Sequence, residues 1–190
     1  MAQTKSKVLH FIGNRIFKYV YKNPEKNILK LIKIGKAAAG RMYPESTFTK
    51  PIEILKDKNN VWNTFLFRGL KEVDEEMLRK AVLTFGIDLG LIGTSTLRKK
   101  RDEEHCNIPW VILLDPTSAC NMKCKGCWAA EYGHNSKLTL DEMRRIVTEA
   151  KAIGTHFFMY TGGEPLIRKK DILTVARENS DCLSLAYTNG

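Results

Sequence analysis

Three short, mostly apolar runs alternate with two amphipathic patterns over residues 110–187. The runs are Trp110–Asp115, His156–Tyr160 and Cys182–Tyr187, and each has the length and composition of a buried strand. Strand, helix, strand, helix, strand is the order that predicts a parallel sheet joined by right-handed crossovers. The sequence therefore predicts an α/β fold. In such sheets chemistry gathers where the strands end at their carboxyl side.

The two amphipathic patterns have local helix signals. Thr139 is followed three residues later by Glu142, which is a capping box, and Gly154 is a stop signal after the apolar face of the first pattern. The second pattern runs from about Lys170 to Glu178. Both stretches are therefore predicted to be helices that connect the strands.

Three cysteines follow the first predicted strand within eight residues: Cys120, Cys124 and Cys127. Closely spaced thiols in a chain without a secretory signal are more typical of metal ligands than of disulfides. A structural zinc ion usually has four protein ligands, and this loop offers three. In a 4Fe–4S cluster held by three thiolates, one iron stays free to bind another molecule. The spacing therefore favours a reactive iron–sulfur site.

The spacing Cys-x3-Cys-x2-Cys resembles the cluster motif of the radical S-adenosylmethionine (SAM) superfamily. Two further stretches resemble that family in the same order: Tyr160-Thr161-Gly162-Gly163-Glu164-Pro165 is similar to its Gly-Gly-Glu-Pro motif, and Tyr187-Thr188-Asn189-Gly190 to the end of its next strand. The resemblance covers about residues 108–190. It implies a (β/α)6 barrel, of which this chain supplies the N-terminal half, with three parallel strands.

The resemblance also implies cofactors, a reaction and a set of residues. Cys120, Cys124 and Cys127 would hold a 4Fe–4S cluster whose fourth iron binds the amino and carboxylate groups of SAM. An electron from a flavodoxin or ferredoxin would cleave SAM to a 5′-deoxyadenosyl radical that acts on a substrate, which is a small molecule, a lipid-like molecule or a peptide. The implied SAM contacts are Gly162, Gly163, Glu164, Pro165, Thr188 and Asn189. The alternative is a non-catalytic iron–sulfur or zinc-binding module.

Glu164 has a specific role in this expectation, since the family's motif places its carboxylate against the SAM ammonium. Gly162 and Gly163 lack a Cβ, so their backbone can approach a ligand closely. The chain departs from the family at Gly126, where many members have an aromatic residue that packs on adenine. Trp128 either takes over that packing or is a core residue.

The preceding residues form a different region. We expect a basic, mainly helical N-terminal region over residues 1–104 and a truncated radical SAM core over residues 105–190. Because the family's barrel has six strands, we expect the chain to be a piece of a longer enzyme that binds cluster and SAM weakly alone. Arg98–Glu104 is a charged run and the predicted linker.

The positive charge is concentrated at the start of the chain, where residues 1–58 hold 13 Lys and Arg against 4 Asp and Glu, within a total net charge of +10. Residues 8–40 show two basic amphipathic helical patterns separated at Pro24 and closed by Gly40. They form either a helical hairpin docked on the neighbouring domain or an element that lies on an anionic membrane surface. Nucleic acid is not expected, because exposed aromatic residues are not interleaved with the basic ones. With no signal peptide and no long apolar run, we expect a cytoplasmic location, with membrane association as the alternative.

Between these parts the sequence predicts a loop over residues 41–60, which contains Pro44 and Pro51. Residues 61–70 read as a strand or a short helix, and their aromatic residues are expected in the core. Asp74 is predicted to cap a third helix, with Glu75 and Glu76 at its positive end. The predicted buried face of that helix is Leu78, Ala81, Val82 and Phe85, and glycines loosen the chain after it.

Overall fold

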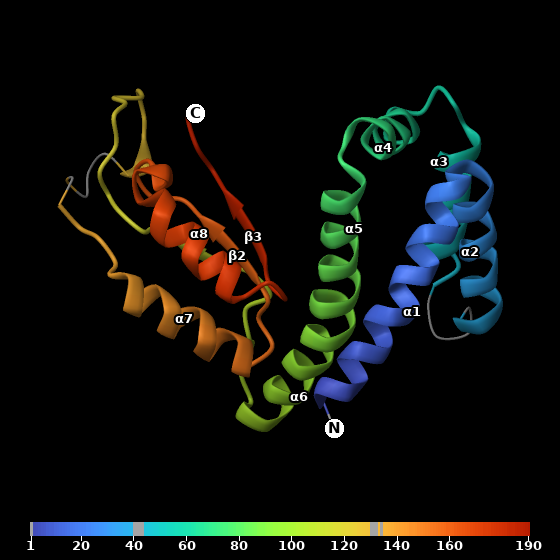
Figure 1. The fold of residues 1–190 in the computed structure, drawn as a ribbon, viewed down its shortest axis with the longest axis horizontal. Helices are drawn as coiled ribbons and strands as arrows, with labels where there is room; N and C mark the ends of the chain where they lie inside the picture. The colour runs from blue at the N-terminus through green and yellow to red at the C-terminus, as the bar shows by residue number, and fades with distance from the viewer. Residues whose placement is uncertain (1, 40–43, 130–132, 134) are drawn as a thin grey trace. The chain divides into compact units, whose positions relative to one another are not determined.

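The computed structural model describes residues 2–39, 44–129, 133 and 135–190, and it shows two compact units, Met1–Leu83 and Thr84–Gly190 (Figure 1). The predicted division after residue 104 lies elsewhere, because the helical segment between residues 84 and 104 groups with the second unit. Among the described residues, no helix combines the length and apolar character needed to cross a membrane.

In the described residues, the first unit contains five helices. They are α1 (Ala2–Lys22), α2 (Pro24–Ala39), α3 (Ser46–Lys56), α4 (Val61–Glu72) and α5 (Glu75–Leu83). The predicted break at Pro24 is confirmed, since Pro24 is the first residue of α2, where its missing N–H costs no helix hydrogen bond. The predicted cap is also confirmed, because the Asp74 carboxylate accepts a hydrogen bond from the Met77 N–H at 2.9 Å. Gly40 lies outside the described residues.

The prediction of a loop over residues 41–60 is wrong for α3. This helix contains Pro51, which removes one backbone donor from its interior. Packing of α3 against α2 supplies tertiary stabilisation that single-residue propensity does not describe. Asn60, which also suggested a loop, caps α4 by accepting a hydrogen bond from the Trp62 N–H at 2.9 Å.

Two aromatic residues of α4 are on the surface, contrary to the prediction, while Phe67 is half-buried. Trp62 is 66% exposed and Phe65 is 69% exposed, and the two rings meet edge to face with centroids 6.2 Å apart. The buried position of this helix belongs to Asn63, whose amide donates to the backbone oxygens of Ile54 and Leu55. Asn63 thus satisfies carbonyls at the end of α3, which turns the aromatic side of α4 outward.

The second unit begins with a π-helix, η1 (Thr84–Gly93), which continues into α6 (Thr94–Glu104). The predicted loose glycine segment and linker are therefore helical. Gly93 has a packing role, because a Cβ there would lie 2.8 Å from the Gly154 backbone oxygen. The predicted buried face is also shifted: Val82 and Phe85 are exposed, whereas Leu83 and Leu89 are buried.

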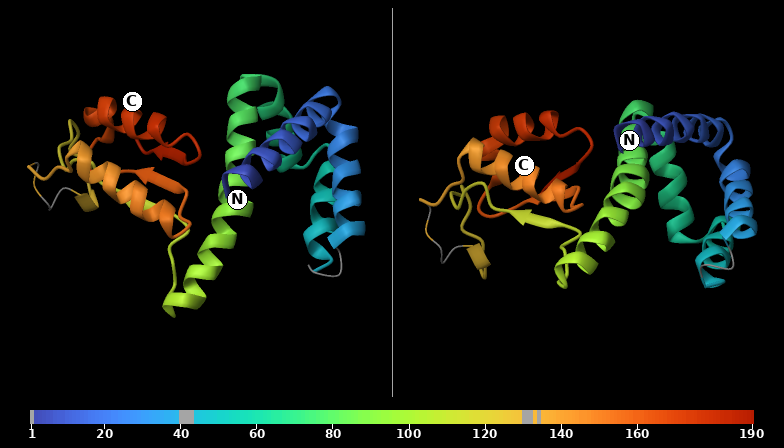
Figure 2. Two further views of the ribbon diagram at one scale, coloured as in Figure 1. Left: turned by 60° about the horizontal axis from the view of Figure 1, so that its bottom comes forward. Right: turned by 90° about the horizontal axis from the view of Figure 1, so that it is seen from below.

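The sheet contains β1 (Ile112–Leu114), β2 (Phe157–Tyr160) and β3 (Leu183–Ala186) in the order β1-β2-β3. Both strand pairs are parallel, with Leu113 opposite Met159 and Met159 opposite Leu185. The helices α7 (Leu140–Ala152) and α8 (Lys169–Glu178) follow β1 and β2 respectively (Figure 2). The predicted α/β fold with three parallel strands is confirmed.

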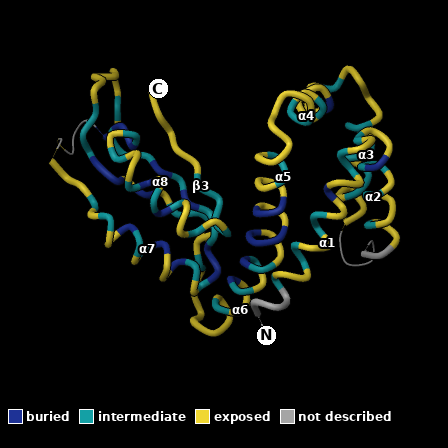
Figure 3. The backbone as a smooth tube through the Cα atoms, viewed as in Figure 1, coloured by how far each residue is buried: buried dark blue, intermediate teal, exposed yellow. Residues whose placement is uncertain are grey.

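The core of the second unit lies between the sheet and these two helices, and Figure 3 shows buried residues in β1 and β2 and on one side of α7. Its members are Leu114, Met143, Val147, Ala150, Phe158, Tyr160, Ile172 and Val175. The predicted capping box fixes the start of α7, since Thr139 Oγ1 accepts from the Glu142 N–H and the Glu142 carboxylate accepts from the Thr139 N–H. This core holds the carboxyl ends of β1 and β2 in place.

Candidate functional site at the carboxyl ends of the strands

The three sequence motifs meet at one edge of the sheet. The cysteine loop follows β1, the Gly-Gly-Glu-Pro stretch follows β2, and Thr188 and Asn189 follow β3. Because the three strands are parallel, their carboxyl ends lie on the same side. The motifs also contact one another through hydrogen bonds of Gly163, Glu164 and Asn189.

The cysteine loop presents three free thiols at or near the surface. Cys120 and Cys127 are half-buried and Cys124 is exposed. The loop is organised by its own backbone, since the Cys127 N–H donates to the Cys124 oxygen at 3.2 Å and the Met122 N–H points to Cys120 Sγ at 3.4 Å. Free thiols on one short loop are a donor set that fits an iron–sulfur cluster.

The thiols of the loop do not all lie as close together as the ligands of a single zinc ion do. A tetrahedral zinc ion with bonds of about 2.3 Å to sulfur brings its thiolates to about 3.8 Å from one another. Among the described residues, the group of three or more metal-ligand side chains within 4.8 Å of one another does not contain the loop cysteines. A cluster of several irons holds its thiolates further apart, as this loop does.

The two glycines after β2 allow the cysteine loop to dock. A Cβ on Gly163 would collide with the Ala119 backbone oxygen and lie 2.6 Å from that of Ser118. Gly162 has a φ of 96°, and a Cβ there would lie 2.8 Å from the Thr117 oxygen. We expected these two glycines to let the backbone approach a ligand closely. In the structure they instead let it approach residues 117–119, which lead into the cysteine loop. Two hydrogen bonds complete the docking, from the Gly163 N–H to Thr117 and from the Glu164 N–H to Ala119.

Glu164 joins the ends of β2 and β3. Its side chain is 6% exposed and accepts three hydrogen bonds: from the Leu166 N–H at 2.9 Å, from Thr188 Oγ1 at 2.8 Å and from the Asn189 N–H at 2.9 Å. Burial alone would raise the pKa of Glu164, but these three donors together outweigh it and hold the pKa below its usual value. The site therefore contains a buried, ionised carboxylate. Since a carboxylate offers about four acceptor positions, one remains for a further donor.

Asn189 links the third motif to the cysteine loop. Its Nδ2 donates to Asn121 Oδ1 at 3.0 Å and lies 4.0 Å from Cys120 Sγ. Through Asn189 and Glu164, the loop after β1 is connected to the ends of both other strands. The geometry thus brings together residues that are up to 69 positions apart in the sequence.

Pro165 and Arg168 also stabilise this arrangement. Pro165 is buried and opens the 3-10 helix η3 (Pro165–Arg168), for which Glu164 is the N-cap. Arg168 donates from Nη1 to the Leu138 oxygen at 2.7 Å and from Nε to Asp171 at 2.7 Å. Arg168 therefore holds in place the segment around Leu138, which follows the cysteine loop. Sequence reasoning missed Arg168, although its position three residues after the Gly-Gly-Glu-Pro stretch was a usable signal.

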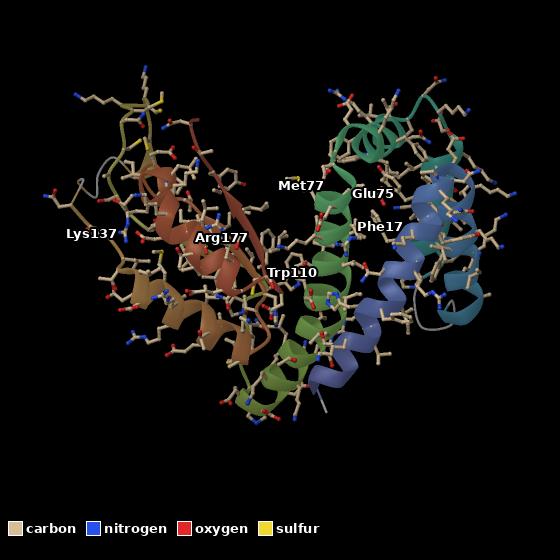
Figure 4. The ribbon with its side chains drawn as sticks, in the orientation of Figure 1. Phe17, Glu75, Met77, Trp110, Lys137 and Arg177 are labelled. Atoms are coloured by element: carbon tan, nitrogen blue, oxygen red, sulfur yellow. The ribbon has the colours of Figure 1, made fainter. Side chains whose placement is uncertain are left out.

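A cleft of about 470 Å³ lies beside the loop, and its lining includes Asp115, Trp128, Lys137 and Gly162. Trp128 is 58% exposed, so it is not a core residue. Burial raises the pKa of Asp115 above its usual value. Figure 4 shows Lys137 on the segment that precedes α7. No sequence pattern indicated Asp115 or Lys137 as site residues, because only the fold places them at one cleft.

The comparisons with known proteins match this part of the chain. Residues 114–183 match the family model of the radical SAM superfamily. The chain is similar to the GTP 3′,8-cyclase of Edwardsiella ictaluri (strain 93-146), with 38% identity over 86 residues, or 42% of this chain and 26% of the relative. The GTP 3′,8-cyclase of Clostridium perfringens (strain SM101) is 38% identical over 89 residues, or 42% of this chain and 27% of the relative.

The matched segment spans about a quarter of the length of these curated relatives. No solved structure matches the chain. The family-model match runs from the last residue of β1 to the first residue of β3, so it includes the cysteine loop and the Gly-Gly-Glu-Pro stretch but not Thr188 and Asn189.

Proposed function

We propose that this chain belongs to the radical SAM superfamily, whose members bind a 4Fe–4S cluster and SAM, and that it takes part in reductive cleavage of SAM. Cys120, Cys124 and Cys127 are the proposed cluster ligands. When bound, the cluster and SAM would supply a 5′-deoxyadenosyl radical for reaction with a substrate. The observation that carries this proposal is the direct connection of the cysteine loop, Glu164 and Asn189 at one sheet edge.

The protein's own residues would hold the reactants in place. The ionised carboxylate of Glu164 has one acceptor position left for the SAM ammonium. Asn189 keeps the cysteine loop against the end of β3, and Gly162 leaves the floor of the cleft open. Trp128 is positioned at that cleft to pack on the adenine, in place of the aromatic residue that Gly126 lacks. Thr188 contributes by fixing Glu164, with which it shares a hydrogen bond of 2.8 Å.

The proposed electron donor is a flavodoxin or a ferredoxin. Lys123 and Lys125 flank Cys124, and all three residues are exposed. A positively charged rim around an exposed cluster ligand suits an acidic one-electron carrier.

The function is tested by incubating the anaerobically reconstituted chain with SAM and dithionite. We expect 5′-deoxyadenosine to form above the background of the Cys124→Ala variant. The Cys106→Ala variant is the matched control, because Cys106 is an exposed thiol outside the loop, and it should behave as the unmodified chain does. Equal amounts of product from the unmodified chain and from Cys124→Ala would contradict the proposal.

Glu164→Gln should weaken SAM binding by about tenfold or more, which corresponds to losing one charge-assisted hydrogen bond of roughly 1.5–3 kcal/mol. Calorimetric titration of SAM into the reconstituted chain measures this change. Glu142→Gln is the control, because Glu142 is exposed and glutamine also serves in a capping box. Unchanged SAM affinity in Glu164→Gln would show that this carboxylate has only its structural role.

For the first unit, we propose contact with an anionic lipid surface through residues 8–40. Val8, Ile12 and Ile16 recur at helical spacing on α1 and are exposed, and Phe11 is 62% exposed. The Arg15 guanidinium lies over the Phe11 ring, 5.5 Å from its centroid. Exposed apolar residues next to basic ones are typical of helices that lie on anionic membranes. Nucleic acid was not expected because the sequence showed no exposed aromatic residues interleaved with the basic ones. The exposure of Phe11 removes that reason.

The chain should therefore sediment with vesicles containing phosphatidylglycerol and stay in solution with phosphatidylcholine alone. Phe11→Ser with Ile12→Ser should reduce the bound fraction several-fold, because each removes apolar area from the lipid. The control is Leu91→Ser, which changes an exposed apolar residue of η1. Equal binding to both kinds of vesicle, or preferential binding to an oligonucleotide, would contradict this proposal.

A further inference from the structure

A second group of ligand side chains lies at the edge of the sheet opposite the cysteine loop. His156 directly precedes β2, and Asp181 and Cys182 directly precede β3. Their ligand atoms lie within 4.8 Å of one another, and each residue is half-buried. Since β2 and β3 are parallel, their amino ends meet at the same edge, away from the three motifs.

The distances within this group approach those of a metal site. His156 Nδ1 is 3.9 Å from Cys182 Sγ and 3.8 Å from Asp181 Oδ2. Around a tetrahedral zinc ion, with bonds of about 2.0–2.3 Å, neighbouring ligand atoms are about 3.3–3.6 Å apart. The observed separations exceed these values by about half an ångström, which small side-chain rotations remove. The other contact of Nδ1, to the Asp181 backbone oxygen at 3.3 Å, is longer than a good hydrogen bond.

The orientation of the imidazole argues for a shared ion and against a catalytic relay. In a nucleophile–histidine–carboxylate arrangement the nucleophile and the carboxylate face different ring nitrogens. Here the thiol and the carboxylate both lie near Nδ1.

The surroundings favour a cation. Lys151 Nζ binds Asp181 Oδ1 at 2.8 Å and Asn179 Oδ1 at 3.1 Å, which orients the Asp181 carboxylate and leaves its Oδ2 toward the histidine. Such contacts to a ligand's second oxygen are common behind metal sites. The carboxylate of Asp88, 4% exposed on η1, is close enough to act on the Cys182 charge and adds negative potential.

The glycine at the end of η1 fixes the histidine ring. A Cβ on Gly93 would lie 3.2 Å from His156 Cδ2, so the backbone of η1 reaches the ring closely. The ring position is thus set by the fold of the second unit.

We propose that His156, Asp181 and Cys182 form a binding site for a divalent transition-metal ion of the zinc type. One nitrogen, one oxygen and one sulfur ligand suit a borderline-soft ion, and the fourth position is open to water. Binding displaces the thiol proton into solvent. The ion would tie the start of β3 to the start of β2 and so hold the strand whose other end carries Thr188 and Asn189.

The test uses the full chain with Cys120, Cys124 and Cys127 all replaced by serine, so that the loop thiols cannot contribute. Co²⁺ alone is the probe, because a thiolate ligand gives it a charge-transfer absorption in the near ultraviolet. We expect about one Co²⁺ per chain with this absorption, and we expect Zn²⁺ to displace it. Adding Cys182→Ser should abolish the band, whereas adding Cys106→Ser should leave it unchanged.

Asp181→Asn provides a second variant that does not alter the packed core, because the Asp181 side chain is 44% exposed. It should weaken Co²⁺ binding at least tenfold while circular dichroism stays unchanged. Lack of the charge-transfer band in the loop-serine chain would overturn the proposal. A band of full intensity with Cys182→Ser, or unchanged affinity with Asp181→Asn, would overturn it as well.

Discussion

Replacing any one of Cys120, Cys124 and Cys127 by alanine is expected to remove nearly all of the reconstituted cluster. Three thiolates hold a cluster whose fourth iron has no protein ligand, so two thiolates leave two irons without one. The measurement is iron and acid-labile sulfide per chain after anaerobic reconstitution, together with the visible absorption of the cluster. Counting sulfide separates a cluster from iron bound singly elsewhere.

The two remaining cysteines are the matched controls. Cys106 is exposed and Cys182 lies at the opposite sheet edge, so Cys106→Ala and Cys182→Ala should keep the full sulfide content. A full cluster in Cys120→Ala, or its loss in Cys182→Ala, would show that the ligands are assigned wrongly.

The second large effect is expected at Gly163, where alanine should undo the docking of the cysteine loop. Its Cβ would collide with the Ala119 oxygen, and because the obstacle is backbone, relief requires the loop to move. We expect a local loss of about 4 kcal/mol or more, the range that marks a severe packing defect. Hydrogen exchange of the backbone amides from residue 115 to 120, followed by mass spectrometry, measures this loss as faster exchange.

Gly126→Ala is the control within the same loop. Gly126 has a φ of 75°, but no atom lies within 4 Å of a Cβ built there. Its cost is therefore only the left-handed conformation, about 1–2 kcal/mol. If Gly163→Ala and Gly126→Ala change the exchange of residues 115–120 equally, the close docking of the two motifs is not as described.

Much of the second unit could be predicted from the sequence because its signals are local. Thr139 and Glu142 form a capping box within four residues, and Gly154 ends the same helix with a φ of 98°. The parallel pairing followed from the alternation of strand and helix patterns. The meeting of the three motifs at one edge followed from that pairing, without knowledge of side-chain contacts.

The contacts within the site could not be predicted, since their partners are distant in the sequence. Position 163 requires a glycine because the Ala119 backbone oxygen leaves no room for a Cβ. Glu164 accepts hydrogen bonds partly from Thr188 and Asn189. A motif shows which residue type is present but not which of its atoms are already satisfied by the protein. This is why Glu164 turned out to be a structural link as well as a candidate ligand contact.

The errors in the helical segments α4, α5 and η1 have the same origin. The apolar pattern of α4 suggested burial of Trp62, whereas the buried face is set by Asn63 and the carbonyls at the end of α3. In α5 and η1 the change from an α-helix to a π-helix shifts the periodicity, so the 3.6-residue pattern points to the wrong side. Tertiary partners and helix type decide both cases.

The most direct test of the proposed site is electron paramagnetic resonance of the reduced, reconstituted chain with and without SAM. Binding of SAM to the iron that lacks a protein ligand changes the electronic surroundings of the cluster. We expect a reduced-cluster signal whose g values shift when SAM is added, with a smaller shift at the same SAM concentration in Glu164→Gln. A signal that is identical with and without saturating SAM would contradict the account.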